Sequence, residues 1–153
     1  MIDTNAPVRT AYYTALNGLV SVVIPEQGTT AQVIPVHSMT PVSTTYPYIY
    51  IGNQSDDGDV ETKTRDNKFA TEHLIEVIIV DGFRLADENQ SYKTIDDIAN
   101  IVLGLVLSGT PLTFVGIGNI VTEFDSGEYD VTLNDTHLVI TRKIVIKHLL
   151  SQN

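Results

Sequence analysis

Residues 68–84, KFATEHLIEVIIVDGFR, are the longest run of strand-forming residues in the chain, and they decide the fold. β-Branched and aromatic side chains fill this run, and neither Gly nor Pro interrupts it before Gly82. Glu72 and Glu76 lie on the same face, so that face must reach water in its first half. Both faces become apolar towards Val80, which predicts that the second half is covered on both sides. We therefore expect the central strand of a sheet here.

The composition fits a globular protein with one domain, residues 1–153. The hydrophobic fraction is 42% and the charged fraction 18%. The absence of cysteine excludes disulfides and thiolate metal sites. No apolar run reaches the roughly 18 residues that a membrane span needs. Because MIDTNAP lacks a basic and then apolar leader pattern, we expect a soluble protein, made in the cytoplasm, that does not contact a membrane.

The net charge is 9 − 19 = −10, and residues 51–100 carry twelve acids and five bases, a balance of −7. An acidic surface does not hold nucleic acid by its phosphates, because duplex DNA carries about one negative charge per 1.7 Å of axis. Such a surface suits a place where DNA slides past without sticking. Solubility alone is the simpler explanation of the charge.

Two stretches have helical periodicity. Residues 4–18 place their apolar side chains on one stripe, with Thr4 or Asn5 as a cap, Pro7 in the first turn and Gly18 at the end. Residues 91–107 repeat Ile, Val and Leu at helical spacing over a broad face, so this helix should lie flat on a sheet.

Residues 46–54, YPYIYIGNQ, are predicted to form another strand, with short extended pieces at 19–24 and 33–37 before it. One face of the predicted strand carries a row of tyrosines, Tyr46, Tyr48 and Tyr50. A half-buried sheet face explains these tyrosines. The alternative is an aromatic contact surface for a partner, since Tyr is favoured in interface cores.

Residues 55–67, SDDGDVETKTRDN, are polar and without periodicity, which predicts a long hairpin loop between two strands. The first acids fall near the spacing of a calcium loop. However, Thr64 stands at the twelfth position, where a bidentate Glu is required, and the flanking segments are strands rather than helices. A solvated acidic loop is therefore the better interpretation.

Residues 119–129 and 136–150 are predicted to be the last two strands, with clean alternation in the second. The order helix, strand, strand, helix, strand, strand predicts an α+β fold. We expect a largely antiparallel sheet of four to five strands with two helices packed on one face.

No enzyme signature is found. His73 and His137 could meet on adjacent strands near a carboxylate, but ordinary surface positions are the simpler expectation for these two and for His37 and His148. The serines lack a nucleophile elbow, and the Gly-x-Gly at 116–118 lacks the third glycine of a phosphate cradle. We predict no catalytic residue, no metal and no cofactor.

The order of these elements resembles the tail-completion, or tail-terminator, proteins of long-tailed phages, which join the tail to the head. The resemblance runs through VRTAYYTALNG, VIPVHSMTPVSTTYPYIYIGNQ, TKTRDNKFATEHLIEVIIVDGF, SYKTIDDIANIVLGLVL, PLTF and ITRKIVIKHLL, which together span nearly the full length. These are patterns of order and length rather than catalytic motifs. The chain departs from the pattern in the Thr- and Pro-rich residues 25–45.

The resemblance implies a non-enzymatic virion protein at the head–tail junction. Such proteins form a ring, here expected to have six subunits with twelve as the alternative, that caps the tail tube. The implied partners are copies of the chain, the tail-tube protein and the head connector, portal or adaptor protein, and DNA passes through the lumen without sequence-specific binding. On this basis four acids are hypothesised to lie in an inter-subunit or lumen loop: Asp56, Asp57, Asp59 and Glu61.

Two alternatives stay open on the sequence. The chain could be a neck or connector ring protein that binds the portal of a short-tailed or diverged phage. It could also be of another class, a small cytosolic binding domain or a hydrolase with the same order of elements. A tail terminator and a neck protein differ in their neighbours. A protein of the other class would not be found in particles.

Overall fold

The computed structural model describes residues 4–24, 27–41, 45–61, 69–84, 91–108, 112–133 and 135–152. It contains two helices, α1 (Asn5–Leu16) and α2 (Lys93–Val106). Three short strands come early in the chain: β1 (Ser21–Val23), β2 (Ala31–Val33) and β3 (Val36–His37). Four long strands follow: β4 (Tyr48–Glu61), β5 (Phe69–Arg84), β6 (Ile117–Leu133) and β7 (His137–Gln152).

The main sheet has the order β3-β4-β5-β7-β6, and β1 and β2 form a separate antiparallel pair. Only the short β3–β4 pairing is parallel, whereas β4–β5, β5–β7 and β7–β6 are antiparallel. The α+β fold class and the central position of the strand at residues 69–84 are therefore confirmed.

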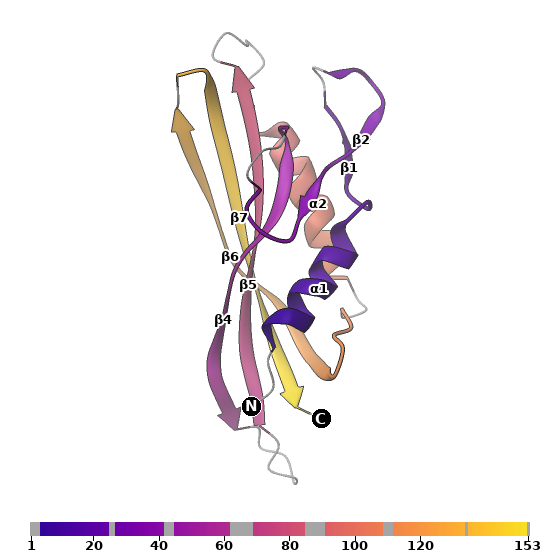
Figure 1. The fold of residues 1–153 in the computed structure, drawn as a ribbon, viewed down its shortest axis with the longest axis vertical. Coiled ribbons are helices and arrows are strands. Elements are labelled where there is room, and N and C mark those ends of the chain that lie inside the picture. Colours follow the sequence, from indigo (N-terminus) through magenta and orange to yellow (C-terminus); the bar gives the residue numbers. More distant parts are fainter. Residues whose placement is uncertain are drawn as a thin grey trace.

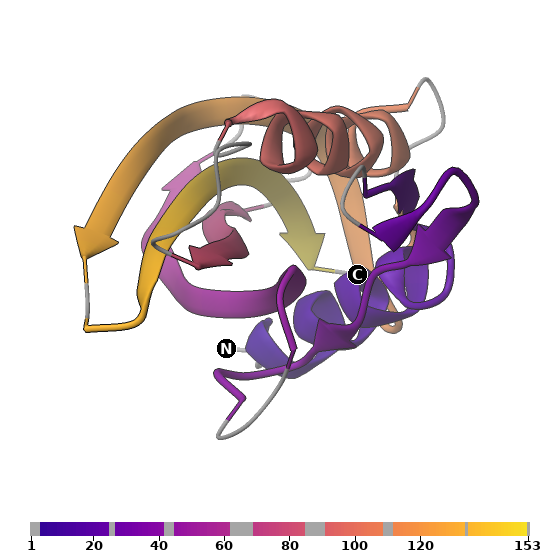
Figure 2. The ribbon, with the colours of Figure 1, turned by 90° about the horizontal axis from the view of Figure 1, so that it is seen from above.

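Both helices and the β1–β2 pair lie on the same side of the main sheet (Figures 1 and 2). The sheet is twisted, and the end of the β6–β7 hairpin near Leu133 and His137 projects away from α1. Neither helix in the described part of the chain is long and apolar enough to cross a membrane.

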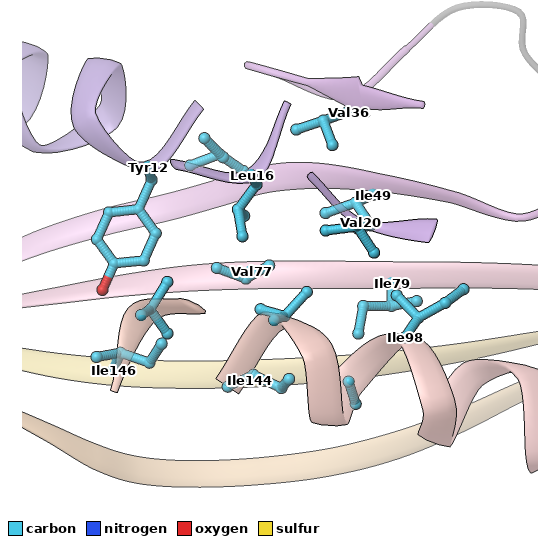
Figure 3. Close-up of a cluster of buried hydrophobic side chains, with 14 of the residues drawn as sticks. Tyr12, Leu16, Val20, Val36, Ile49, Val77, Ile79, Ile98, Ile144 and Ile146 are labelled. Carbon is cyan, nitrogen blue, oxygen red and sulfur yellow. The ribbon is translucent and has the colours of Figure 1, made fainter. Parts of the chain in front are cut away.

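The helices bury apolar stripes against the sheet. Val8, Tyr12 and Leu16 of α1 recur every four residues, so they form one face of the helix, and all three are buried. The broad face of α2 is buried as its periodicity predicts. Figure 3 shows these side chains meeting inward-facing residues of the strands, among them Ile49, Val77, Ile79, Ile144 and Ile146.

The second half of β5 is covered on both faces, as its sequence predicts. Ile79 is fully buried on the helix side, while Ile78 and Val80 on the opposite face are only 8% and 5% exposed. No helix of the described residues covers that opposite face. Cross-strand neighbours in β4 explain the cover instead, because Tyr48 pairs with Val80 and Tyr50 with Ile78.

Three predictions of local structure were wrong. The strand predicted to end at residue 54 continues to Glu61, so the segment expected to be a loop is partly strand. The extended piece at 33–37 is two strands separated around Pro35, which has no N–H for a ladder. Thr4 precedes α1 as expected, but its hydroxyl makes no cap bond and donates elsewhere.

Candidate interaction surfaces

A row of stacked tyrosines lies on the sheet face opposite the helices. The ring centroids of Tyr46 and Tyr48 are 5.9 Å apart and those of Tyr48 and Tyr50 6.2 Å, with interplanar angles of 25° and 29°. The ring of Tyr46 covers Gly82, where a Cβ atom would come within 2.6 Å of it. All three side chains are half-buried, as predicted. Burial, followed by the neighbouring Tyr46 and Tyr50, raises the pKa of Tyr48. A role of the row in contacting a partner stays a prediction.

The four acids hypothesised to lie in a loop belong to strand β4. Asp59 is paired with Thr71 and Glu61 with Phe69 in the antiparallel ladder with β5, and the register shifts between Asp56 and Asp59. The side chain of Asp56 points to neighbours within its own chain. The assignment of the four acids to a ring contact or a lumen stays a prediction. They belong to a strand rather than to a free loop.

Charged pairs cross the same open face between β5, β7 and β6. The Lys143 ammonium lies 2.7 Å from a Glu128 carboxylate oxygen and 3.8 Å from one of Glu76. The hydrogen bond to Glu128 is the main cause that raises the pKa of Lys143, and the charge of the same Glu128 adds to it. Lys147 lies 3.5 Å from Glu123. Such ion pairs near the surface contribute little to stability. They place the lysines of β7 between acids of the neighbouring strands on this face.

A buried network ties the start of α1 to the sheet through His73. Its Nδ1 lies 2.6 Å from Oδ1 of Asp56, and the same oxygen accepts a hydrogen bond of 2.7 Å from the Thr4 hydroxyl. Its Nε2 lies 3.0 Å from Nε2 of Gln54, whose amide also donates to the carbonyl of Asn5. Both ring nitrogens have a suitable partner when His73 carries its proton on Nδ1. Nδ1–H then donates to Asp56, and Nε2 accepts from the Gln54 amide.

Arg9 extends this network to the outer edge of β4. Its Nε donates to Oε1 of Gln54 at 2.8 Å, and its other nitrogens donate to the carbonyls of Ile51 at 2.9 Å and of Gly52. A further hydrogen bond reaches the carbonyl of Ser38. The planar fork of Arg9 therefore binds backbone groups where β3 no longer pairs with β4.

A second buried network surrounds His148. The Tyr12 hydroxyl contacts its Nε2, while Nδ1 lies 3.0 Å from Thr122 Oγ1 and 3.2 Å from Asn119 Oδ1. The ring of Phe114 packs edge-on at 5.1 Å. Burial, followed by the charge of neighbouring His73, lowers the pKa of His148 to about 4. Burial also raises the pKa of Tyr12.

Two of the histidines are buried rather than at the surface. His73 and His148 are 0% exposed, so the expectation of surface positions was wrong for both. The suggested meeting of His73 with His137 was also wrong, since His73 pairs with His148 and His137 pairs with Arg84. Among the described side chains, no group of three or more His, Cys, Asp or Glu could hold a metal ion.

Two surface hollows lie on different sides of α1. One of about 540 Å³ is lined by Arg9, Met39, Tyr50 and Glu76, among others, at the outer edge of β4. The other, of about 530 Å³, is apolar and runs between small residues of α1 and the segment that includes Leu112 and Val115. The first hollow is lined by several polar side chains, among them Arg9, Asn53 and Glu76, whereas small and apolar residues line most of the second.

The sheet has two edges whose outer sides remain without a strand in the described ranges. β6 is the outermost strand along its whole length, and β4 is outermost beyond the two residues that β3 covers. The residues from Glu123 to Leu133 are all exposed, including Phe124, Tyr129 and Val131. Such edges expose backbone N–H and C=O groups to other chains.

Comparison with solved structures finds the same fold in a chain of a virion. A chain of the structure described as the virion of a native gene transfer agent particle matches with a TM-score of 0.68 and 14% sequence identity. The match covers 99% of this chain and 99% of that chain. No protein-family model matches the sequence, and no curated protein matches it. At this identity the likeness shows that the two chains share a fold.

Proposed function

We propose that the protein is a non-enzymatic structural component of a phage-like virion, and that it forms a ring at the head–tail junction. In this role it caps the tail tube and joins it to the head connector as a tail terminator. The observation that carries the proposal is the end-to-end likeness to a chain of a gene transfer agent virion. The order of elements that resembles tail-completion proteins supports it independently.

The surfaces of the subunit suit a ring. A ring needs two different surfaces on each subunit, because head-to-tail contacts close only when the rotation between neighbours closes. The tyrosine row lies on the sheet face opposite the helices, whereas the apolar hollow is lined by small residues of α1, so the two patches differ in chemistry. Copies of the chain are thus able to meet through unlike patches.

The acidic charge suits a passage for DNA. A net charge of −10 repels phosphates, and a wall within about 8 Å of the duplex would act at physiological salt. We place Asp57, Asp59 and Glu61 at such a wall or at a contact between subunits. Asp56 is different, because its carboxylate already binds Thr4 and His73.

The decisive experiment is an electron cryomicroscopy reconstruction of particles that contain this protein, with the head–tail junction resolved. We expect a closed ring between the tail tube and the head connector. A ring that contacts the portal alone would favour the neck-protein alternative. Absence of the protein from mature particles, or turnover of a small molecule by the purified protein, would contradict the proposal.

The acidic wall has its own test. The triple variant Asp57→Asn, Asp59→Asn, Glu61→Gln removes three charges and leaves the Asp56 contacts intact. We expect normal folding but altered ring assembly or slower DNA ejection. Unchanged assembly and ejection would show that these acids do not face the lumen or a neighbouring subunit.

A further inference from the structure

The outer edge of β6 is long, exposed and acidic. β6 spans 17 residues and, within the described ranges, pairs along one side only, with β7. Its exposed half carries no Lys, Arg or Pro, and it contains four acids, Glu123, Asp125, Glu128 and Asp130. All four are exposed. Glu123 and Glu128 form ion pairs with lysines of β7.

The usual protection of an edge explains only part of this one. Proteins protect an edge with short strands, charged side chains, Pro or β-bulges, and β6 has acids and two irregularities, between Asn119 and Val121 and between Phe124 and Ser126. However, the strand is long and exposes large apolar side chains, with Phe124 49%, Val131 46% and Leu133 69% exposed. Such apolar area along an edge strand is typical of a surface that another chain covers.

Charge decides which chain fits. The opposite edge of the sheet, β4, carries Asp57, Asp59 and Glu61 on its last residues. Pairing β6 of one copy with β4 of another would set two acidic strands side by side, and like charges on opposed strands are destabilising. The outer edge of β4 is also partly engaged, because Arg9 binds its carbonyls at Ile51 and Gly52.

We propose that the outer edge of β6 binds an extended, Lys- or Arg-bearing segment of a different protein, which adds to the sheet as a further strand. Main-chain hydrogen bonds supply the affinity, and the acids of β6 select a basic strand and reject a second copy. The inference deepens the proposed function by giving the chemistry of one partner. It does not require the ring, so the two can fail separately.

The test uses the full-length protein and two synthetic peptides. The first is a nine-residue strand-forming peptide of alternating Lys with Thr or Val. The second keeps every Lys but has Pro at the central Thr and Val positions, so it has the same charge and lacks the N–H groups of a strand. We expect the first peptide to bind at least tenfold more tightly by fluorescence anisotropy. We also expect it to slow amide exchange in residues 121–133.

Matched variants then locate the site. Asp125→Lys with Asp130→Lys should weaken binding of the first peptide at least tenfold, and Asp125→Asn with Asp130→Asn should weaken it less. The same reversal on the opposite edge, Asp57→Lys with Asp59→Lys, should change the dissociation constant by less than threefold. Circular dichroism checks that each variant keeps its melting temperature, as expected for exposed positions.

Three results would overturn the proposal. Equal binding of both peptides would show attraction by charge alone. Two outcomes would place the site on the other edge. One is loss of peptide binding in the β4 reversal, and the other is slowed amide exchange in β4 rather than in β6. Ring formation that is lost in the β6 reversal without any peptide present would show that a second copy occupies this edge.

Discussion

His73 of β5 and His148 of β7 lie directly opposite each other in the sheet, and both side chains are completely buried. Each is contacted from a different part of the first helical segment, since Thr4, just before α1, contacts His73 and Tyr12, within α1, contacts His148. The pair therefore joins the first helix to two long strands. The protonation state of His148 is coupled to the stability of that junction.

Stability should fall as the pH drops from about 6.5 to about 4. The folded pKa of His148, about 4, lies below its ordinary value of 6.5, so in this window the unfolded chain binds a proton that the folded chain does not. Such a group makes stability rise with pH, by about 1.4 kcal/mol per pH unit at most. The contribution is complete above pH 6.5 and totals about 3 kcal/mol. Urea unfolding at several pH values measures it.

The matched control for this titration is His148→Gln, which keeps a polar side chain and cannot titrate. We expect the variant to be less stable than the parent at pH 8, and the gap to shrink by about 3 kcal/mol between pH 7 and pH 4. Carboxylates titrate in both proteins and cancel in the difference. A gap independent of pH would contradict the proposed burial of a neutral imidazole.

Asp56→Ala should destabilise the protein by about 1–3 kcal/mol. The change leaves the buried Nδ1–H of His73 and the Thr4 hydroxyl without their shared acceptor, and an unsatisfied buried donor costs about that much. Asp125→Ala, which removes an exposed acid, should stay within about 0.5 kcal/mol of the parent. Chemical denaturation distinguishes the two, and equal effects would mean that the Asp56 contacts contribute nothing.

Arg9→Ala should cost about 2 kcal/mol, because its guanidinium donates to three backbone carbonyls and to Gln54. Arg9→Lys should recover less than half of that loss. Lysine keeps the charge but has no planar fork that reaches several carbonyls at once. Full rescue by Lys would show that charge, rather than geometry, matters at this edge. Amide exchange in β4 near Gly52 provides a local measurement.

Gly82→Ala and Gly104→Ala should act in opposite directions. A Cβ at Gly82 would come within 2.6–2.8 Å of the Tyr46 ring, so we expect a loss of about 1–3 kcal/mol from overpacking. A Cβ at Gly104 of α2 meets nothing within 4 Å, and Ala is the better helix former by about 0.8–1 kcal/mol. Thermal melts of both variants check the signs, and a neutral Gly82→Ala would show that the tyrosine row moves freely.

The sequence predicted the elements whose pattern is local. The centre of the sheet and α2 both follow from uninterrupted periodicity, which survives any choice of neighbours. The end of β4 did not follow, because Asp and Gly are poor strand formers and local propensity favours a loop there. Pairing with β5, which continues to Phe69, overrides that preference.

The buried histidines were missed although a signal was present. His73 has the same strand parity as Ile75 and Val77, and His148 the same parity as Ile144 and Ile146, so each lies on the face that the helices cover. Alternation alone places both on the packed face. Which side chains satisfy them could not be predicted, because Tyr12 and Thr4 come from a helix far away in the sequence.

The hydrogen bond between Tyr12 and His148 joins residues 136 positions apart. During synthesis at about 5–20 residues per second, the first helix is made roughly 7–27 s before its buried partner. For that interval its apolar stripe lacks the β7 part of the sheet. We therefore expect nascent chains that stop before β7 to be the ones that chaperones capture and proteases remove.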